Sequence, residues 1–140
     1  MNYIETKKHL NRAFMSRQRI KSKRERLDRW KDQTTEITVQ LSKDPVISTS
    51  EKQQTEKAIV AIVDLERTIE KDISDLAKLE LEIQKEINLL DDDLQKTVLE
   101  LRYLNFMKWD DICMELNYSS RQIFNIHKSA IMSFMKKQKK

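Results

Sequence analysis

The chain of 140 residues contains no glycine and a single proline, Pro45. Glycine adopts positive φ angles without steric cost, so its absence argues against tight hairpin turns and against glycine loops that cradle phosphates. Apolar residues make up 39% of the chain and aromatic residues 6%, which is little for a large globular core. The sequence therefore predicts an all-α protein of long helices that is elongated or completes its core by self-association.

The first long helix is predicted over residues 3–42. Its apolar positions recur at steps of three and four residues and include Leu10, Phe14, Ile20, Leu27, Ile37 and Leu41. Pro45 ends it, because the residue before a proline is pushed out of the α region. Residues 43–50 are the predicted loop, and Ser48, Thr49 or Ser50 is expected to cap the next helix.

The second long helix has a narrower and cleaner apolar seam than the first. The seam consists of Ile62, Leu65, Ile69, Ile73, Leu76, Leu79, Ile83, Ile87 and Leu90. This spacing is typical of a coiled coil. The seam is expected to pair with the first helix in a long antiparallel helical hairpin, and the alternative is pairing with a second copy in a homodimer. Residues 1–90 would then form an arm and residues 91–140 a separate small domain with a basic tail.

Charge is strongly segregated along the chain. Residues 1–31 carry a net charge of +8, residues 32–90 carry −6 and residues 91–140 carry +2. Basic ends indicate a polyanionic partner, although the acidic second helix would neutralise part of the basic first one.

The periodicity shortens after Leu90. Asp91, Asp92 and Asp93 mark a helix start, and a helix over 109–116 follows a short link. Asn117 is expected in the left-handed region, where it is the best substitute for glycine. Ser119 or Ser120 would cap a last helix. Residues 92–137 therefore predict a helix-turn-helix, held together by Ile112, Leu116, Ile123 and Ile126, with Tyr118 packed beneath them.

This segment resembles region four of bacterial sigma factors over about 45 residues. The features that agree are Leu101-Arg102-Tyr103, the run from Trp109 to Leu116, Tyr118-Ser119 and Ala130-Ile131. The whole chain further resembles short regulatory proteins of phages and prophages of Gram-positive bacteria, in which a helical N-terminal arm precedes a sigma-like C-terminus. The resemblance implies a DNA-binding regulator of transcription that reads double-stranded DNA through its recognition helix.

Carried over residue by residue, the resemblance assigns base contacts to Ser120, Arg121, Gln122 and Asn125. Ser120 stands where the family usually has Arg, and Arg121 stands where it usually has Glu. Because Arg prefers guanine and a carboxylate accepts from cytosine, the target is expected to differ from a standard promoter element.

Contacts to the DNA backbone are expected from Ser119, Lys128, Lys136 and Lys137, and a second basic surface from Arg17, Lys21 and Arg24. For all of these the plain alternative is a solvated helix face. The runner-up function is a protein-interaction module, since region four also binds RNA polymerase.

The sequence contains few features that would indicate other kinds of function. Cys113 reads as a buried structural thiol, and His127 as a phosphate-contacting or surface residue. No nucleophile–base pair, metal-ligand spacing or cofactor motif is legible, so neither an enzyme nor a metal or cofactor site is expected. No apolar run approaches a membrane span, so a cytoplasmic protein is expected.

Overall fold

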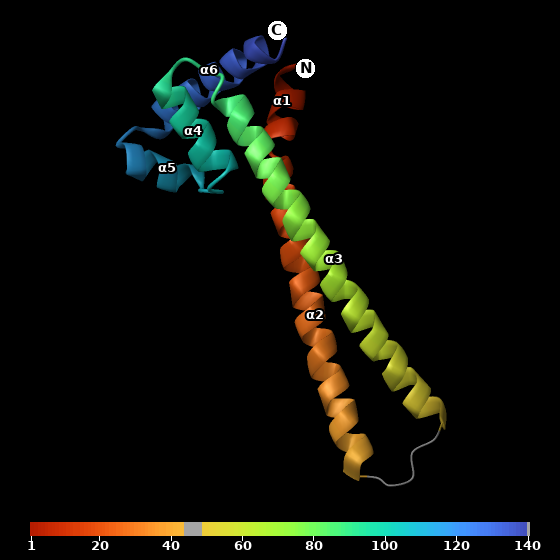
Figure 1. The fold of residues 1–140 in the computed structure, drawn as a ribbon. Helices are drawn as coiled ribbons and strands as arrows, with labels where there is room; N and C mark the ends of the chain where they lie inside the picture. The colour runs from red at the N-terminus through yellow and green to blue at the C-terminus, as the bar shows by residue number, and fades with distance from the viewer. Residues whose placement is uncertain (44–48, 140) are drawn as a thin grey trace. The chain divides into compact units, whose positions relative to one another are not determined.

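The computed structural model describes residues 1–43 and 49–139, and within these the side chains from residue 40 to residue 43 are left aside. The described part is all-helical and contains no strand. Figure 1 shows its helices, which are α1 (Tyr3–Leu10), α2 (Arg12–Lys43), α3 (Thr49–Ile87), α4 (Asp93–Tyr103), α5 (Trp109–Leu116) and α6 (Ser120–Gln138). Pro45 and Ser48 lie outside the described residues, whereas Thr49 and Ser50 belong to α3.

The prediction of one continuous helix over residues 3–42 is wrong at one position. Asn11 separates α1 from α2 and has φ −80° and ψ −1°, and its N–H points to both His9 O and Lys7 O. The interruption is short, because Met15 N still donates to Asn11 O at 3.1 Å. α1 begins in a capping box in which Asn2 and Glu5 bond each other's backbone N–H groups.

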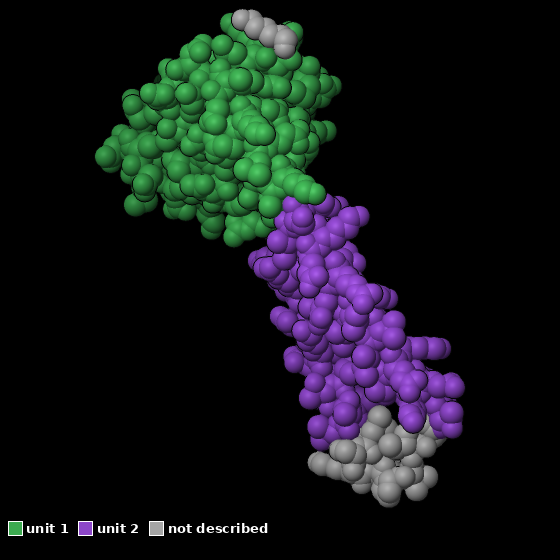
Figure 2. Space-filling view, viewed as in Figure 1, with its two compact units in different colours: residues 1–17, 76–140 green, residues 18–75 purple. Residues whose placement is uncertain are grey.

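The chain forms two compact units, coloured in Figure 2. Unit 1 comprises residues 1–17 and 76–140, and unit 2 comprises residues 18–75. The helices α4–α6 thus share their unit with α1 and with the last turns of α3. Both of these segments were expected in the arm of residues 1–90.

Unit 1 has a core to which helices from both ends of the chain contribute. Its buried members are Leu10, Ala13, Ile83, Ile87, Leu90, Leu99, Tyr103, Ala130, Ile131 and Phe134. α1 packs against α6, and His9 Nε2 lies 2.6 Å from Glu86 Oε2 on α3. Burying each large apolar side chain contributes about 1.5–3 kcal/mol, so this core accounts for the packing of five helices around one another.

Unit 2 consists of the remaining parts of α2 and α3, which run alongside each other in opposite directions (Figure 1). Lys23 pairs with Asp72, and Lys31 Nζ lies 3.1 Å from Glu66 Oε1. Ile20 and Ile69, at 4% and 6% exposed, are the buried residues among those described in this unit. Ile73, although part of the predicted seam, is 40% exposed, so a single neighbouring helix covers the seam incompletely.

Candidate nucleic-acid interface

The turn between α5 and α6 adopts the conformation that the sequence predicts. Asn117 has φ 58° and ψ 43°, in the left-handed region, and its N–H donates to Cys113 O. Tyr118 N also donates to Cys113 O, at 3.1 Å. Asparagine enters this region more readily than other residues with a side chain, which explains how a chain without glycine makes the turn.

The first turn of α6 is closed by a capping box. Gln122 N donates to Ser119 Oγ at 3.2 Å, and Ser119 N donates to Gln122 Oε1 at 2.9 Å. Ser119 is therefore the N-cap, one of the two residues predicted for that role. Gln122 has committed its side-chain carbonyl to the cap, so only its amide NH₂ remains as a donor to another group.

A small second core holds α5 against α6. Val98, Ile112 and Ile123 are buried in it, and packed around them are Leu101, Met107, Trp109, Cys113, Leu116, Tyr118 and Ile126. The predicted packing of Ile112, Leu116, Ile123 and Ile126, with Tyr118 beside them, is confirmed. Cys113 packs against this core but is only half-buried, less than the buried thiol that the sequence predicts.

The opposite face of α6 is open to solvent. Ser120, Arg121, Asn125 and Lys128 are exposed there, and the last three recur at steps of four and three residues along one face. α6 contains no Asp or Glu over its whole length. The face therefore offers hydroxyl, guanidinium, amide and ammonium groups without a carboxylate to repel an anion.

The prediction that His127 contacts phosphate or lies at the surface is wrong. His127 is 3% exposed, and its Nε2 lies 2.7 Å from the hydroxyl of Tyr103. It follows Ile123 by four residues and precedes Ala130 by three, which places it on the buried face of α6. The helical periodicity alone could have shown this.

Burial sets the charge state of this hydrogen-bonded pair. It lowers the pKa of His127 to about 4, with smaller contributions from the positive charges of Lys7 and Arg102. Burial also raises the pKa of Tyr103 to about 12. Both side chains are therefore neutral near pH 7, as two buried groups that share one hydrogen bond should be.

Aromatic side chains cluster where α5 begins. The ring of Trp109 lies 4.7 Å from that of His127, in an edge-on arrangement, and 5.5 Å from that of Phe124. Arg102 lies over the Trp109 ring at 4.8 Å. Phe124 is still 53% exposed. The cluster anchors the start of α5 to the middle of α6.

The lysines predicted to contact the DNA backbone do not form one group. Lys136 and Lys137 follow Ser120 by 16 and 17 residues, which is about 24 Å along a helix that rises about 1.5 Å per residue. Lys137 Nζ lies 3.2 Å from Asp91 Oδ2, so its charge is already partly neutralised. Ser119, the N-cap, and Lys128 lie by contrast toward the same end of α6 as Arg121 and Asn125.

The second basic surface is divided between the two units. Arg17, in unit 1, places its guanidinium 4.8 Å from the Phe106 ring. Lys21 and Arg24, in unit 2, are exposed and make no ion pair with any described residue. Phe106 itself has φ 59°, a left-handed conformation in the link between α4 and α5 that the sequence did not predict.

Sequence reasoning also missed a group of cations elsewhere in unit 1. Lys7 and Lys8 of α1 line a pocket together with Arg102 of α4. Two adjacent lysines in a sequence are by themselves only a weak indication of an anion-binding pocket. The contact of α1 with α6 joins residues more than 100 positions apart, and no local pattern announces it.

Taken together, the structure defines an all-helical protein with two compact units. Among the described helices, none combines the length and apolar character needed to cross a membrane. The same residues contain no group of three His, Cys, Asp or Glu side chains that could hold a metal ion.

The chain belongs to the DUF1492 family of proteins of unknown function, whose match spans residues 37–135. The match takes in α3 to α5 and most of α6. No curated protein and no solved structure shows significant similarity to the chain.

Proposed function

We propose that this protein is a regulator of transcription that binds double-stranded DNA through α6, with α5, the Asn117 turn and α6 acting as a helix-turn-helix. The observation that carries the proposal is the exposed face of α6, which is cationic and amide-bearing on a helix without any carboxylate. Its other face is committed to the core through Ile123, Ala130 and Phe134. A helix anchored in this way can enter the major groove as a rigid element.

The proposed contacts follow from the chemistry of the exposed side chains. Arg121 would donate two hydrogen bonds to guanine O6 and N7, and Asn125 would pair with N6 and N7 of adenine. Ser120 lies beside them, and the free amide NH₂ of Gln122 can donate to a base acceptor. Ser119 and Lys128 would bind the flanking phosphates. Phosphate contacts position the protein on the duplex without selecting a sequence.

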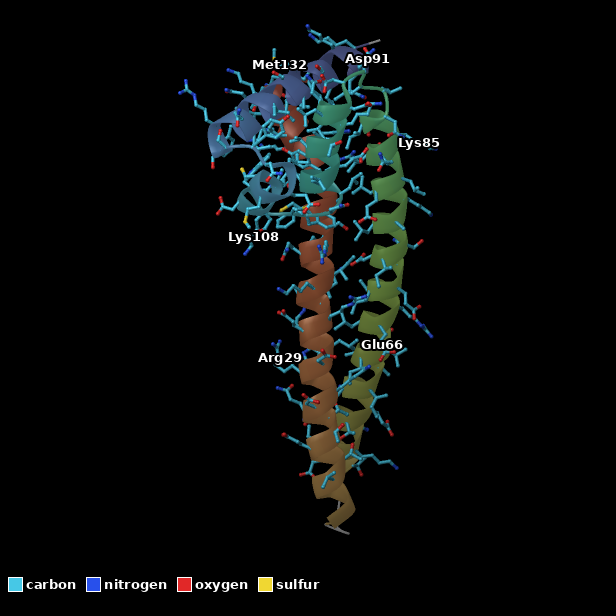
Figure 3. The ribbon with its side chains drawn as sticks, turned by 90° about the vertical axis from the view of Figure 1, so that its left-hand side faces the viewer. Arg29, Glu66, Lys85, Asp91, Lys108 and Met132 are labelled. Atoms are coloured by element: carbon cyan, nitrogen blue, oxygen red, sulfur yellow. The ribbon has the colours of Figure 1, made fainter. Side chains whose placement is uncertain are left out.

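The resemblance to sigma region four supports a joint role for α4, α5 and α6 in binding DNA. In this role, α4 would support the pair of helices, α5 would lie across the DNA backbone and α6 would read the groove. Lys108 directly precedes α5 and is exposed, where it could approach the backbone (Figure 3). The whole chain would then act near a promoter of a phage or prophage.

A second function is favoured by apolar side chains that lie open on α5 and α6. Met114 is 78% exposed, Phe124 53% and Met132 45%. Methionine and phenylalanine at such exposure are typical of protein-binding surfaces. RNA polymerase is the partner that the sigma likeness suggests, and binding it need not exclude binding DNA.

The test is selection of duplexes from a random-sequence pool at low salt, followed by affinity measurement on the enriched sequence. We expect a defined sequence to be enriched. Arg121→Ala and Asn125→Ala should each weaken binding to that sequence by about 5- to 150-fold, which corresponds to 1–3 kcal/mol for a bidentate base contact. Their affinity for unrelated duplexes should change far less.

Lys85→Ala is the matched control, because Lys85 is an exposed cation of unit 1 on α3 that makes no ion pair with any described residue (Figure 3). It should leave the selected complex intact. Absence of enrichment at low salt, together with binding of the chain to purified RNA polymerase, would overturn the DNA-reading proposal in favour of the second function.

A further inference from the structure

Unit 1 contains a polar pocket between α1, the end of α4 and the start of α5. It has a volume of about 280 Å³ and is lined by Lys7, Lys8, Asn11, Arg102, Tyr103 and Trp109. Sites for drug-sized ligands are mostly apolar and about 300–1,000 Å³ in volume, so this pocket suits a smaller and more polar group.

The lining carries three cations and no carboxylate. Lys7, Lys8 and Arg102 make no ion pair with any described residue. Some other cations of the molecule are paired with carboxylates: Arg12 approaches Glu82, Lys23 pairs with Asp72, and Lys31 pairs with Glu66. Asp110 and Asp111 follow Trp109 directly in the chain, but neither lines the pocket. Three positive charges therefore converge without an acidic neighbour to neutralise them.

Arg102 is held in place before any ligand arrives. Its Nη1 donates to Met107 O at 2.9 Å, and its guanidinium carbon lies over the Trp109 ring, 4.8 Å from the ring centre. A guanidinium has five N–H donors, so donors remain after the bond to Met107. Because Arg102 is already ordered, binding an anion would cost little of its side-chain entropy.

Lys7 and Lys8 are brought to Arg102 by the docking of α1. Leu10 and Thr6 are fully buried on the same short helix, and Leu10 belongs to the core of unit 1. The field of these cations extends into the protein, since Lys7 and Arg102 both help to lower the pKa of the buried His127. The positive charge at the pocket is thus built into the fold and uncompensated.

We propose that this pocket binds a phosphate group, held by Lys7, Lys8 and Arg102 with the side-chain amide of Asn11 as a further donor. Ammonium groups supply point charges and the guanidinium supplies paired donors, which together suit a phosphate. The phosphate group would come from the backbone of the bound duplex, and this assignment rests on the proposed function. Trp109 opens α5, the helix that would cross that backbone. A free phosphate-containing anion is the other source.

The first test compares Lys7→Gln/Lys8→Gln with Lys78→Gln/Lys85→Gln, a control pair of exposed lysines on the unit 1 part of α3. The pocket variant should weaken binding to every duplex alike and lower the slope of log K against log salt by about 1, the value expected for one lost phosphate contact. The control pair should leave the slope unchanged, and Lys7→Arg/Lys8→Arg should restore it. A wild-type slope in the pocket variant would overturn the duplex as the source while leaving the proposed function intact.

The second test is a titration of the isotope-labelled full chain with inorganic pyrophosphate, followed by NMR. The amides of Lys7, Lys8 and Asn11 and the indole N–H of Trp109 should shift, and Lys7→Gln/Lys8→Gln should abolish the shifts. If the wild type binds no duplex but shows these shifts, the proposed function is wrong and the phosphate pocket stands with a free anion as its source. Absence of shifts at the pocket, with no effect of the variant on duplex binding, would overturn the proposal that the pocket binds phosphate.

Discussion

The apolar seam of α3 runs through both units, but its side chains are more completely buried in unit 1 than in unit 2. In unit 1, Ile83, Ile87 and the following Leu90 are fully buried, because α1, α4 and α6 supply side chains that pack over them. In unit 2, α2 is the neighbour of the seam, and Ile69 is buried while Ile73 is 40% exposed. One sequence pattern thus gives a closed core where several helices meet and a half-covered seam where two do.

The difference shows what periodicity can and cannot specify. A repeat of three and four residues determines which side of a helix is apolar. How completely that side is covered depends on helices elsewhere in the chain. In unit 2, Ile37 of the first apolar stripe and Ile73 of the seam are 43% and 40% exposed, which reflects a shortage of neighbours and not a change of pattern.

The comparison is tested most directly by the same substitution at two points of the seam. Ile83→Ala should lower the free energy of unfolding by about 4 kcal/mol, near the upper part of the range for buried isoleucine, because the packed core cannot collapse around the cavity. Ile69→Ala should cost about 2 kcal/mol, because a two-helix contact can close up more easily. Urea unfolding followed by circular dichroism measures both. Equal costs would show that the two units are equally well packed.

The stability of unit 1 should depend on pH, because His127 lies in this unit. Its pKa is about 4 in the folded protein and about 6.5 when unfolded, so below pH 6.5 the unfolded chain binds a proton that the folded chain does not. Stability should therefore fall as the pH drops from about 6.5 to about 4, by roughly 3 kcal/mol from this group.

His127→Gln removes the titrating group and can retain an acceptor for the Tyr103 hydroxyl. Unfolding measured at several pH values should show a weaker loss between pH 7 and pH 4 for this variant than for the wild type. Parallel pH profiles would mean that His127 does not govern the acid sensitivity of unit 1.

The turn between α5 and α6 offers a smaller perturbation, again confined to unit 1. Asn117→Ala should destabilise the protein by about 1 kcal/mol, because alanine has the same Cβ crowding in the left-handed region but lacks the side-chain amide that can hydrogen-bond locally and offset it. Asn117→Gly should be tolerated at this φ and serves as the control. Thermal unfolding of the two variants gives the comparison, and an alanine variant as stable as the glycine variant would contradict the observed backbone conformation.

The smallest effect is expected from the surface of unit 2. The side chains of Lys31 and Glu66 are 50% and 42% exposed, so their ion pair is screened by water and salt. A double-mutant cycle with Lys31→Ala and Glu66→Ala should give a coupling free energy of about 0.2–1 kcal/mol that declines at high salt. A coupling well above this range would show that charge, more than apolar contact, holds unit 2 together.

Local signals predicted the parts of the molecule that local physics determines. Asn117 and Ser119 were predictable because the left-handed region and the N-cap position each accept few residue types. His127 was misplaced because it was judged by its chemistry, although the spacing to Ile123 and Ala130 put it inside. The pocket at Lys7, Lys8 and Arg102 could not be derived from sequence, because it depends on α1 docking beside helices that lie far along the chain.

That docking also has a consequence for how the protein is made. Leu10 and Phe134 share one core but are 124 positions apart, and a ribosome that adds about 5–20 residues per second produces the second roughly 6–25 s after the first. During that interval α1 has been synthesised without most of its packing partners, and its apolar side chains remain open to chaperones and to other nascent chains. Unit 2 consists of consecutive residues and has no such delay, so during synthesis the half-covered unit can form before the closed one.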